Sequence, residues 1–550
     1  MNRLAQLVAA LLFVSVPFAD VAIAAEAPHA MVAAEGDRAA QIGLDVINRG
    51  GNAIDAAVAI SLALSVTNSA SCGIGGGGFM LIYLAREHKF YALDYREVAP
   101  KAATRDMYTK DGKPDEKLAQ NGPLAVAVPG EIAGLDTALR RFGTMKFSAL
   151  AAPVVKLGRE GFPLSEHMAR DVTLSADLIK QDLGLRAAFF HPDGTPMKAG
   201  ETVYAKPLAA MLESLGDNPA DRFYRGDVAK QINEYMMAHG GLVRSADLID
   251  YHPIWRDPLH LRYREYDLYT MPPPSSGGVV LEMLGMLAPG HLDALGLNSP
   301  PYLAQLTEVM RQGFIDRDQY ADPAFARVPI AELLSPEHIA ESRHKALHNE
   351  TSPSVTEAHD HGTSNFCVVD KAGNIVDVTS TINTIFGAKI TVPDIGLILN
   401  DEMDDFAVAP GVPNAFKLIQ AEANAIAPGK RPLSSMSPLI ALRHGKPALV
   451  EGGSGGPTII TGVVQVALNT LDFDLNAQAA VANPRIHHQA VPPPIIIEKA
   501  IPESTTKALA NMGYSIKVVP ELGAVTAIRI KPNVLQGGFD PRKGGAAVGD

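Results

Sequence analysis

Two threonines, Thr363 and Thr381, have the residue type and spacing for covalent chemistry. They bracket a predicted β-hairpin, in which strand-forming residues lie on both sides of a turn at 370–374. Gly373 can supply the positive φ that such a turn needs. A turn centred on Ala372 places Thr363 opposite Thr381, with Cβ atoms about 5 Å apart. A slip of one residue would break this pairing.

A polar segment leads into the first strand of this hairpin. Residues 348–362 have no apolar period, which is typical of an exposed, mobile segment, and Thr363 follows directly. Such a leader indicates a precursor that cleaves itself between Gly362 and Thr363. The new α-amino group, with an ordinary pKa of about 8, could then be the base for its own hydroxyl. The alternative, a plain junction between a loop and a strand, stays open on the hairpin alone.

A rival nucleophile lies in the glycine-rich turn 452–456. The turn matches the G-x-S-x-G nucleophile elbow, and it stands between a predicted strand and a predicted helix. Asp472 or Asp474, followed by His487, would complete a triad with Ser454. The sequence therefore also predicts a possible serine esterase.

The same turn allows a second role. Gly455 and Gly456 present bare N–H groups at the start of the predicted helix 458–471. Such groups can form an oxyanion hole for a nucleophile from another part of the chain. The pattern does not separate this role from that of a serine elbow.

Other polar clusters have the chemistry to bind small charged groups. Ser434 and Ser435 lie in a proline-stiffened turn, and with a cation such as Arg96 they could hold a carboxylate. The four acids in 400–405 could bind Ca²⁺ or an ammonium group, but they lack calcium-loop spacing. The ordinary interpretation of both clusters is a solvated turn. The two histidines of 359–361 could bind a metal, although a flexible leader makes a poor cage.

Strands and helices are predicted in both halves of the chain, which indicates an α+β layered fold. The glycine run 73–78 lacks the lysine of a P-loop and precedes a strand, so we expect close backbone packing there. From 124 to about 350 the pattern is mainly helical. The expected helices are 37–49, 54–66, 133–141, 147–158, 208–215, 304–314 and 458–471, and the expected strands outside the hairpin are 79–84, 91–95, 396–400, 437–443 and 449–453.

The composition is that of an ordinary globular protein. Of the 550 residues 47% are apolar and 20% charged, and the net charge of −12 argues against nucleic acid or an anionic membrane as the main partner. Cys72 and Cys367 cannot form a disulfide framework. A basic start, an apolar run at 4–18 and a small-x-small site at 22–24 predict a signal peptide over 1–24 and an exported, soluble protein. A membrane anchor is the alternative.

Several ordered motifs resemble those of the γ-glutamyltranspeptidase family, and the resemblance extends from Ala33 to 540–542. The motifs are 73–79, Asp94-Tyr95-Arg96-Glu97, Thr379-Ser380-Thr381-Ile382-Asn383-Thr384, Glu402-Met403-Asp404-Asp405-Phe406, Pro432-Leu433-Ser434-Ser435-Met436-Ser437-Pro438 and Asn483-Pro484-Arg485. The resemblance implies an N-terminal-nucleophile hydrolase with an α+β fold, a four-layer αββα sandwich. It also implies a precursor cleaved into a large subunit, 25–362, and a small subunit, 363–550.

The resemblance assigns catalytic roles. Thr363 corresponds to the nucleophile and new N-terminus, and Thr381 to its hydroxyl partner. Gly455 and Gly456 match the oxyanion-hole pair. The implied substrate-binding residues are Arg96, Ser434 and Ser435 for the α-carboxylate, and Asn383, Glu402 and Asp405 for the α-amino group. Residues 410–427 resemble the lid over the pocket, with Phe416 where relatives carry an aromatic gate.

The implied function is a γ-glutamyl hydrolase and transferase that acts on glutathione-like donors, with water or an amino acid or peptide as acceptor. No cofactor or metal is expected. One departure concerns the oxyanion turn, where Gly453-Ser454 replaces the Ser-Pro pair of many bacterial members. A cephalosporin or glutaryl acylase of the same fold, a serine esterase using Ser454 and a non-catalytic amino-acid-binding protein are the competing hypotheses.

Overall fold

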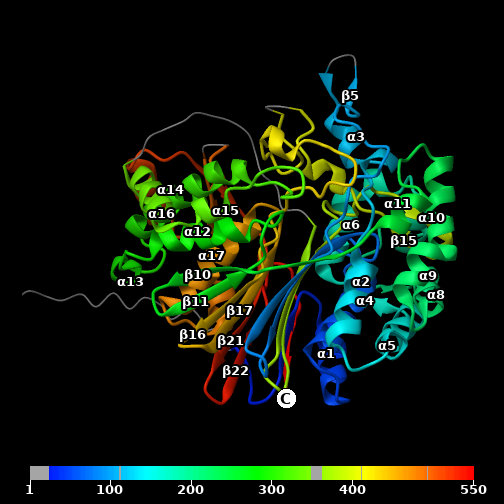
Figure 1. The fold of residues 1–550 in the computed structure, drawn as a ribbon, viewed down its shortest axis with the longest axis horizontal. Helices are drawn as coiled ribbons and strands as arrows, with labels where there is room; N and C mark the ends of the chain where they lie inside the picture. Colours follow the sequence, from blue (N-terminus) through cyan, green and yellow to red (C-terminus); the bar gives the residue numbers. More distant parts are fainter. Residues whose placement is uncertain (1–23, 111–112, 349–361, 410–411, 492–493) are drawn as a thin grey trace, which may run out of the picture.

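The chain forms two β-sheets that face each other between two layers of helices (Figure 1). The computed structural model describes residues 24–110, 113–348, 362–409, 412–491 and 494–550. This architecture confirms the predicted α+β fold, a four-layer αββα sandwich. Most of the predicted signal peptide and the 359–361 histidine pair lie outside the described residues. In the described part of the chain, no helix is long and apolar enough to cross a membrane.

Each large sheet has seven strands, and all neighbouring strands within it are antiparallel. The first sheet has the order β1 (Ala25–Ala27), β22 (Val534–Gly538), β21 (Ala524–Lys531), β17 (Lys446–Ser454), β16 (Leu439–Arg443), β11 (Tyr266–Thr270) and β10 (Leu259–Tyr263). The second has the order β23 (Ala546–Gly549), β2 (Met31–Ala34), β12 (Ser364–Val369), β13 (Ile375–Thr381), β3 (Gly77–Leu84), β4 (Lys89–Asp94) and β9 (Ile254–Arg256).

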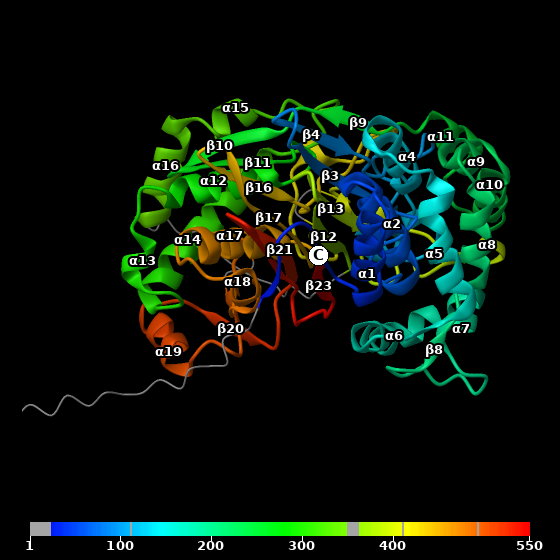
Figure 2. The ribbon, with the colours of Figure 1, turned by 90° about the horizontal axis from the view of Figure 1, so that it is seen from below.

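The helices cover the two outer faces, as the view from below also shows (Figure 2). On the side of the second sheet lie α1 (Asp37–Asn48), α2 (Ala53–Thr67), α4 (Glu131–Phe142), α5 (Phe147–Glu160), α6 (Glu166–Ile179), α7 (Leu183–Phe189), α8 (Lys206–Leu215), α9 (Pro219–Arg225), α10 (Asp227–Ala238) and α11 (Ser245–Asp250). On the side of the first lie α12 (Gly277–Leu287), α13 (Leu292–Leu295), α14 (Pro300–Asp316), α15 (Ile330–Leu333), α16 (Pro336–Leu347), α17 (Thr458–Leu471), α18 (Ala477–Ala482) and α19 (Glu503–Asn511).

The central strands of the second sheet, β2, β12, β13 and β3, are buried on both faces because both faces are covered. In β12, Phe366 and Val368 join the core under α1 and α2, whereas Cys367 and Val369 join the core between the sheets. This alternation follows from the two-residue period of a strand. Cys72 and Cys367 are both buried free thiols.

The predicted hairpin register is confirmed. β12 and β13 pair with Ser364 opposite Ser380 and Val369 opposite Ile375, which is the register centred on Ala372. The carboxylate of Asp370 accepts hydrogen bonds from the N–H groups of Ala372 and Asn374, both 2.9 Å, and this closes the turn.

Most of the helices predicted from periodicity are confirmed to within a few residues, and α17 has the predicted bounds. Asn52 caps α2 as expected, with its side-chain oxygen accepting from two N–H groups of the first turn. The mainly helical prediction for 124–350 is wrong at β9, β10 and β11. The predicted strand 396–400 shortens to β15 (Leu397–Ile398), which pairs with β14 (Thr391–Val392). These strands have only two to five residues, which is too few to show a clear two-residue alternation of apolar and polar side chains.

The remaining short elements connect or flank these layers. They are α3 (Glu116–Gln120), β5 (Thr109–Lys110), β6 (Lys113–Pro114), β7 (Phe162–Pro163), β8 (Thr202–Val203), β18 (Ile486–His487), β19 (Ile495–Glu498), β20 (Ile516–Val519), and the 3₁₀ turns η1 (Pro123–Ala125), η2 (Arg317–Gln319), η3 (Pro393–Ile395), η4 (Glu402–Asp405) and η5 (Glu422–Asn424).

The glycine run before β3 allows close backbone packing, as expected. A Cβ on Gly76 would lie 1.9 Å from the carbonyl oxygen of Thr381, and one on Gly75 would lie 1.9 Å from that of Ile398. These glycines therefore allow the end of β13 to sit against the loop before β3.

We predict that Gly76→Ala destabilises the protein by at least about 2 kcal/mol, because the new methyl group meets backbone that cannot rotate away. The matched control is Gly290→Ala, where the nearest atom would be 3.4 Å from the added Cβ. Urea unfolding monitored by circular dichroism measures both. Equal midpoints for the two variants would contradict the packing argument.

Candidate active site

The hydroxyl groups of Thr363 and Thr381 contact each other across the start of the hairpin. Their Oγ1 atoms lie 3.0 Å apart, and both residues are buried, with 4% and 2% exposure. The Asn383 N–H donates to Thr381 Oγ1 at 2.8 Å and fixes that hydroxyl beside Thr363. The register of β12 and β13 therefore brings together the two threonines singled out in the sequence.

The backbone at Thr363 is strained while the chain is intact. Its φ is +138°, in a region that β-branched residues rarely adopt. Such conformations cost on the order of 1–3 kcal/mol and persist only where the surroundings impose them. Here the preceding Gly362 is enclosed by carbonyl groups, and an added Cβ would lie 3.1 Å from the oxygen of Asn383. The Lys543 ammonium donates to the Thr363 carbonyl at 3.1 Å.

The glycine turn lies at the end of β17, beside the strand that follows Thr363. Gly455 and Gly456 have φ values of +116° and +59°, which explains why both are glycine. A Cβ on Gly452 would lie 2.3 Å from the side chain of Asn365, so the end of β17 packs closely against β12. Within the described residues, neither glycine N–H of the 455–456 pair donates a hydrogen bond. The turn therefore has two N–H donors open for an oxyanion.

Ser454 is tied to a buried carboxyl group. Its hydroxyl donates to Glu35 Oε1 at 2.5 Å, and the Lys543 ammonium lies 4.0 Å from the other Glu35 oxygen. Burial raises the pKa of Glu35 to about 7, against the opposing effects of Lys543 and of the bond from Ser454. Ser454, Glu35 and Lys543 thus connect the glycine turn with the carbonyl of Thr363.

The predicted serine triad is wrong. His487 contacts Thr461 through Nδ1 and Gln489 through Nε2, both at 2.9 Å, and neither nitrogen faces Ser454. Asp472 accepts instead from the hydroxyl of Tyr263 at 2.7 Å. The elbow motif matched because a strand, a glycine turn and a helix follow one another here, whatever residue faces the serine.

Asp474, the other predicted triad acid, pairs with Arg529. Burial lowers the pKa of His487 to about 4. His487 and its neighbour His488 are buried at 0% and 5% exposure, which agrees with a structural role. Within the described residues, none of the three predicted triad partners therefore contacts Ser454.

A cluster of opposite charges is buried near this centre. Arg96 is fully buried and pairs with Glu402 and Asp405, and its Nε donates to the Pro432 carbonyl at 3.3 Å. Burial alone would lower the pKa of Arg96, but the two carboxylates raise it overall. The expectation of an exposed acidic turn at 400–405 is wrong, because Arg96 neutralises part of the cluster and permits its burial.

The other residues predicted to bind substrate lie around this ion pair. Asn383 donates to the Asp401 carbonyl at 3.0 Å, and the hydroxyl of Ser434 accepts from the Met436 N–H at 3.2 Å. The hydroxyl of Ser435 accepts from Arg317 at 3.4 Å.

Sequence reasoning missed Arg317, which is 4% exposed and also donates to Ser276 at 2.9 Å. Burial lowers its pKa to about 10. Its only sequence signal was a lone arginine at the end of a helix.

The predicted lid contacts the glycine turn. A Cβ on Gly456 would lie 2.5 Å from the Phe416 ring, so this aromatic side chain covers Gly456 directly. Asn414 holds the tip by accepting from the N–H groups of Phe416 and Leu418 at 3.0 and 3.1 Å. Residues 410–411 of the predicted lid lie outside the described residues.

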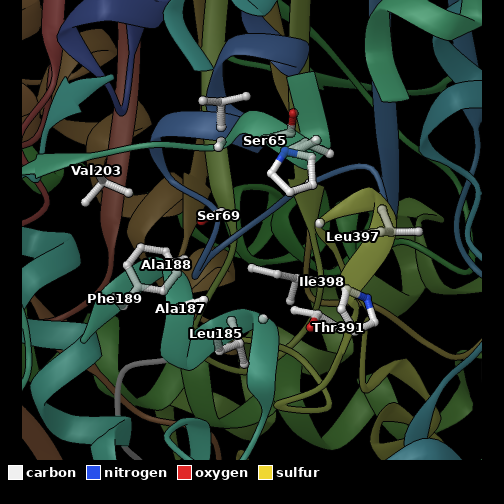
Figure 3. Close-up of a pocket in the computed structure, with 18 of the residues that line it drawn as sticks. Ser65, Ser69, Leu185, Ala187, Ala188, Phe189, Val203, Thr391, Leu397 and Ile398 are labelled. Carbon is white, nitrogen blue, oxygen red and sulfur yellow. The ribbon is translucent and has the colours of Figure 1, made fainter. Parts of the chain in front are cut away.

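A separate apolar cavity of about 390 Å³ lies elsewhere, between α2, α7 and the β14–β15 hairpin. Leu185, Phe189, Val203 and Ile398 line it (Figure 3). None of the two threonines, the glycine pair or the Arg96 cluster contributes to its wall.

Comparison with known proteins assigns the chain to a family. The family model described as gamma-glutamyltranspeptidase matches residues 39–550. This chain belongs to the gamma-glutamyltranspeptidase family. It is 38% identical to the glutathione hydrolase proenzyme of Escherichia coli, over 95% of this chain and 92% of that protein. It is 39% identical to the enzyme of the same name from Pseudomonas aeruginosa, over 96% of each chain.

Solved structures agree with this membership. The cephalosporin acylase of Bacillus halodurans superposes with a TM-score of 0.85 at 28% identity, over 97% of this chain and 98% of that chain. The gamma-glutamyltranspeptidase of Helicobacter pylori gives a TM-score of 0.55 at 36% identity, over 56% of this chain and 89% of that chain. The N-terminal-nucleophile hydrolase fold is thereby confirmed, as is the prediction of a γ-glutamyltransferase or glutathione hydrolase at the level of the family.

The raised pKa of Glu35 gives a prediction for stability against pH. The folded state keeps this proton up to about pH 7, whereas the ordinary value is 4.5. Between these values the unfolded chain binds fewer protons, so the free energy of unfolding falls as the pH rises. Glu35→Gln should remove this contribution, on the order of 3 kcal/mol between pH 4.5 and 8.

Apparent melting midpoints of the wild-type protein and Glu35→Gln at pH 5 and pH 8 test this. The melting midpoints of the variant and the wild type should differ least at pH 5. At pH 8 the midpoint of the variant should have risen relative to that of the wild type. Parallel pH profiles would contradict the assignment. Asp217→Asn, at an exposed acid, serves as the control for general charge effects.

Proposed function

We propose that this chain is a self-processing γ-glutamyl hydrolase and transferase that cleaves glutathione and related γ-glutamyl compounds. The 3.0 Å contact between the Thr363 and Thr381 hydroxyls, at the start of a buried strand, is the observation that carries this proposal. Relatives named glutathione hydrolase proenzymes support both the reaction and the precursor form.

The first reaction in the proposal is cleavage of the chain itself. Thr363 Oγ1 attacks the carbonyl carbon of Gly362, and the bond from that carbon to the Thr363 nitrogen breaks as the nitrogen takes up the proton that the hydroxyl loses. The resulting ester is hydrolysed by water, which leaves a carboxylate on Gly362 and a free α-amine on Thr363. The positive φ at Thr363 favours this step because cleavage releases the backbone strain.

The second reaction uses the new chain end. The α-amine takes the proton from the Thr363 hydroxyl, which attacks the γ-carbonyl carbon of the donor. The N–H groups of Gly455 and Gly456 hold the oxyanion, and the departing amine receives the proton. The γ-glutamyl ester on Thr363 then transfers its acyl group to water or to the amine of an amino acid or peptide.

The buried charges suggest how the donor is recognised. An α-amino acid head group carries one ammonium and one carboxylate, and the cluster of Arg96 with Glu402 and Asp405 offers a group of opposite charge to each. In the proposal the substrate ammonium takes the place of Arg96 beside the two acids, with the side chain of Asn383 close by. The substrate carboxylate faces Arg96.

Ser434 and Ser435 complete the carboxylate side of this pocket. Arg317, which donates to Ser435, adds a second positive charge there. A glutaryl substrate lacks the ammonium group and would leave Glu402 and Asp405 without a new partner. This favours a γ-glutamyl hydrolase over a cephalosporin or glutaryl acylase.

Cleavage would leave two chains that remain interleaved. Each large sheet contains strands from both sides of the Gly362–Thr363 bond, including β12 between β2 and β13. We therefore propose that the large subunit, 25–362, and the small subunit, 363–550, stay together. The apolar start of the chain supports export by way of a signal peptide over 1–24.

Thr363→Ala should leave a single uncleaved and inactive chain, because it removes the attacking oxygen. Thr363→Ser keeps that oxygen and should still cleave, at a reduced rate. Denaturing gels with N-terminal sequencing measure this, and the wild type should yield a fragment that starts at Thr363. Ser454→Ala is the control and should still cleave. Cleaved Thr363→Ala would overturn the proposal.

Glu402→Gln should lower kcat/KM for a γ-glutamyl anilide by about 10-fold to 100-fold, since the ammonium loses a charged partner. For the matching glutaryl anilide the loss should be smaller. Glu422→Gln, at an exposed lid acid, is the matched control and should change neither value. Equal losses for both substrates in Glu402→Gln would contradict the assignment of the ammonium site.

A further inference from the structure

Three side chains with metal-binding chemistry meet in the helical layer over the first sheet. Glu282 from α12, Asp316 from α14 and His338 from α16 place their ligand atoms within 4.8 Å of one another. Glu282 and Asp316 are buried at 0% and 6% exposure, while His338 is partly exposed. None of the three belongs to the site described above.

Within the described part of the chain, no hydrogen bond compensates the charge of Glu282. Both of its carboxylate oxygens are buried without a hydrogen-bond partner, and His338 Nε2 lies 3.5 Å from one of them. A buried carboxylate without partners is costly, so this group needs either a proton or a cation.

The spacing of the three groups fits a small tetrahedral ion. His338 Nε2 lies 3.5 Å from Glu282 Oε1 and also 3.5 Å from Asp316 Oδ2. Ligand atoms bound to zinc at about 2.0–2.1 Å are separated by about 3.3 Å in a tetrahedron. The two distances from His338 are close to this ligand-to-ligand separation.

Neighbouring groups orient the ligands. Asp316 Oδ2 accepts from Gln312 at 3.0 Å and from the Ser342 hydroxyl at 3.1 Å. In the metal-free protein Ser342 also hydrogen-bonds His338 Nε2 at 3.1 Å, and an ion that takes this nitrogen would replace that contact. The contacts to Asp316 are of the kind that holds carboxylate ligands in place at metal sites. Partial exposure of His338 gives an ion a route into the cluster.

We propose that Glu282, Asp316 and His338 form a binding site for one divalent transition-metal ion of the zinc type. Two carboxylates balance its charge, an imidazole nitrogen supplies the third ligand, and water fills the fourth position. The ion joins α12, α14 and α16. This role is structural and is independent of the proposed hydrolase reaction.

The position of α16 indicates what a metal ion would stabilise. Under the proposed cleavage, α16 is the last described helix before the new end of the large subunit. A metal bond from His338 to α12 and α14 would keep that helix attached. The next residue after Asp316 is Arg317, so the ion would also stabilise the helix end that supports Ser435.

Zinc binding by the full chain tests the proposal. After treatment with a chelator, the wild type should bind one Zn²⁺ per chain in calorimetry with zinc chloride, and its apparent melting midpoint should rise by about 3 °C or more. Glu282→Gln and His338→Ala should each weaken zinc affinity at least about 10-fold and abolish the rise in midpoint.

The control is His344→Ala, at an exposed histidine on the same helix that stacks on His348. It should bind zinc like the wild type. Loss of binding in His344→Ala would place the ion at that surface pair and overturn the proposal. So would a wild-type protein whose affinity and midpoint match those of His338→Ala, because the cluster would then hold a shared proton. His338 is partly exposed, so its variant keeps the test decisive if Glu282→Gln fails to fold.

Discussion

The contact between two threonine hydroxyls across a hairpin is the constraint on which the rest of the structure depends. A one-residue slip of β12 against β13 would turn Thr363 to the other face of the sheet and away from Thr381. The glycines before β3 and at the end of β17 permit the backbone approaches that keep this hairpin in place. These neighbouring glycine segments therefore help to hold Thr363 and Thr381 in contact.

The molecule also buries two groups of charged side chains. Arg96 with its two carboxylates, and Glu35 with Lys543, lie where isolated charges would be very costly. Such pairs contribute little net stability, but they create sites that a ligand of matching charge can enter by exchange. The proposed γ-glutamyl head group, with one charge of each sign, would enter the Arg96 cluster in this way. The second pair lies beside the Thr363 carbonyl, one peptide bond after the proposed cleavage point between Gly362 and Thr363.

Local features of the sequence were predictable, and distant contacts were not. The hairpin register followed from turn chemistry and strand propensity, and helices such as α17 followed from apolar spacing. The contacts of Arg317, Lys543 and Glu35 join segments far apart in the chain, and no local pattern encodes them. The serine triad failed for the same reason: a motif fixes the turn around Ser454, but only the tertiary fold decides which side chain faces it.

The central claim is that Thr363 is both a chain end and the attacking group. Acid quenching during turnover of a γ-glutamyl donor, followed by peptide mapping in a mass spectrometer, tests it most directly. The account predicts a γ-glutamyl group on the hydroxyl of a peptide whose first residue is Thr363. A γ-glutamyl group on the peptide that contains Ser454, or on Thr363 within an uncleaved chain, would contradict it.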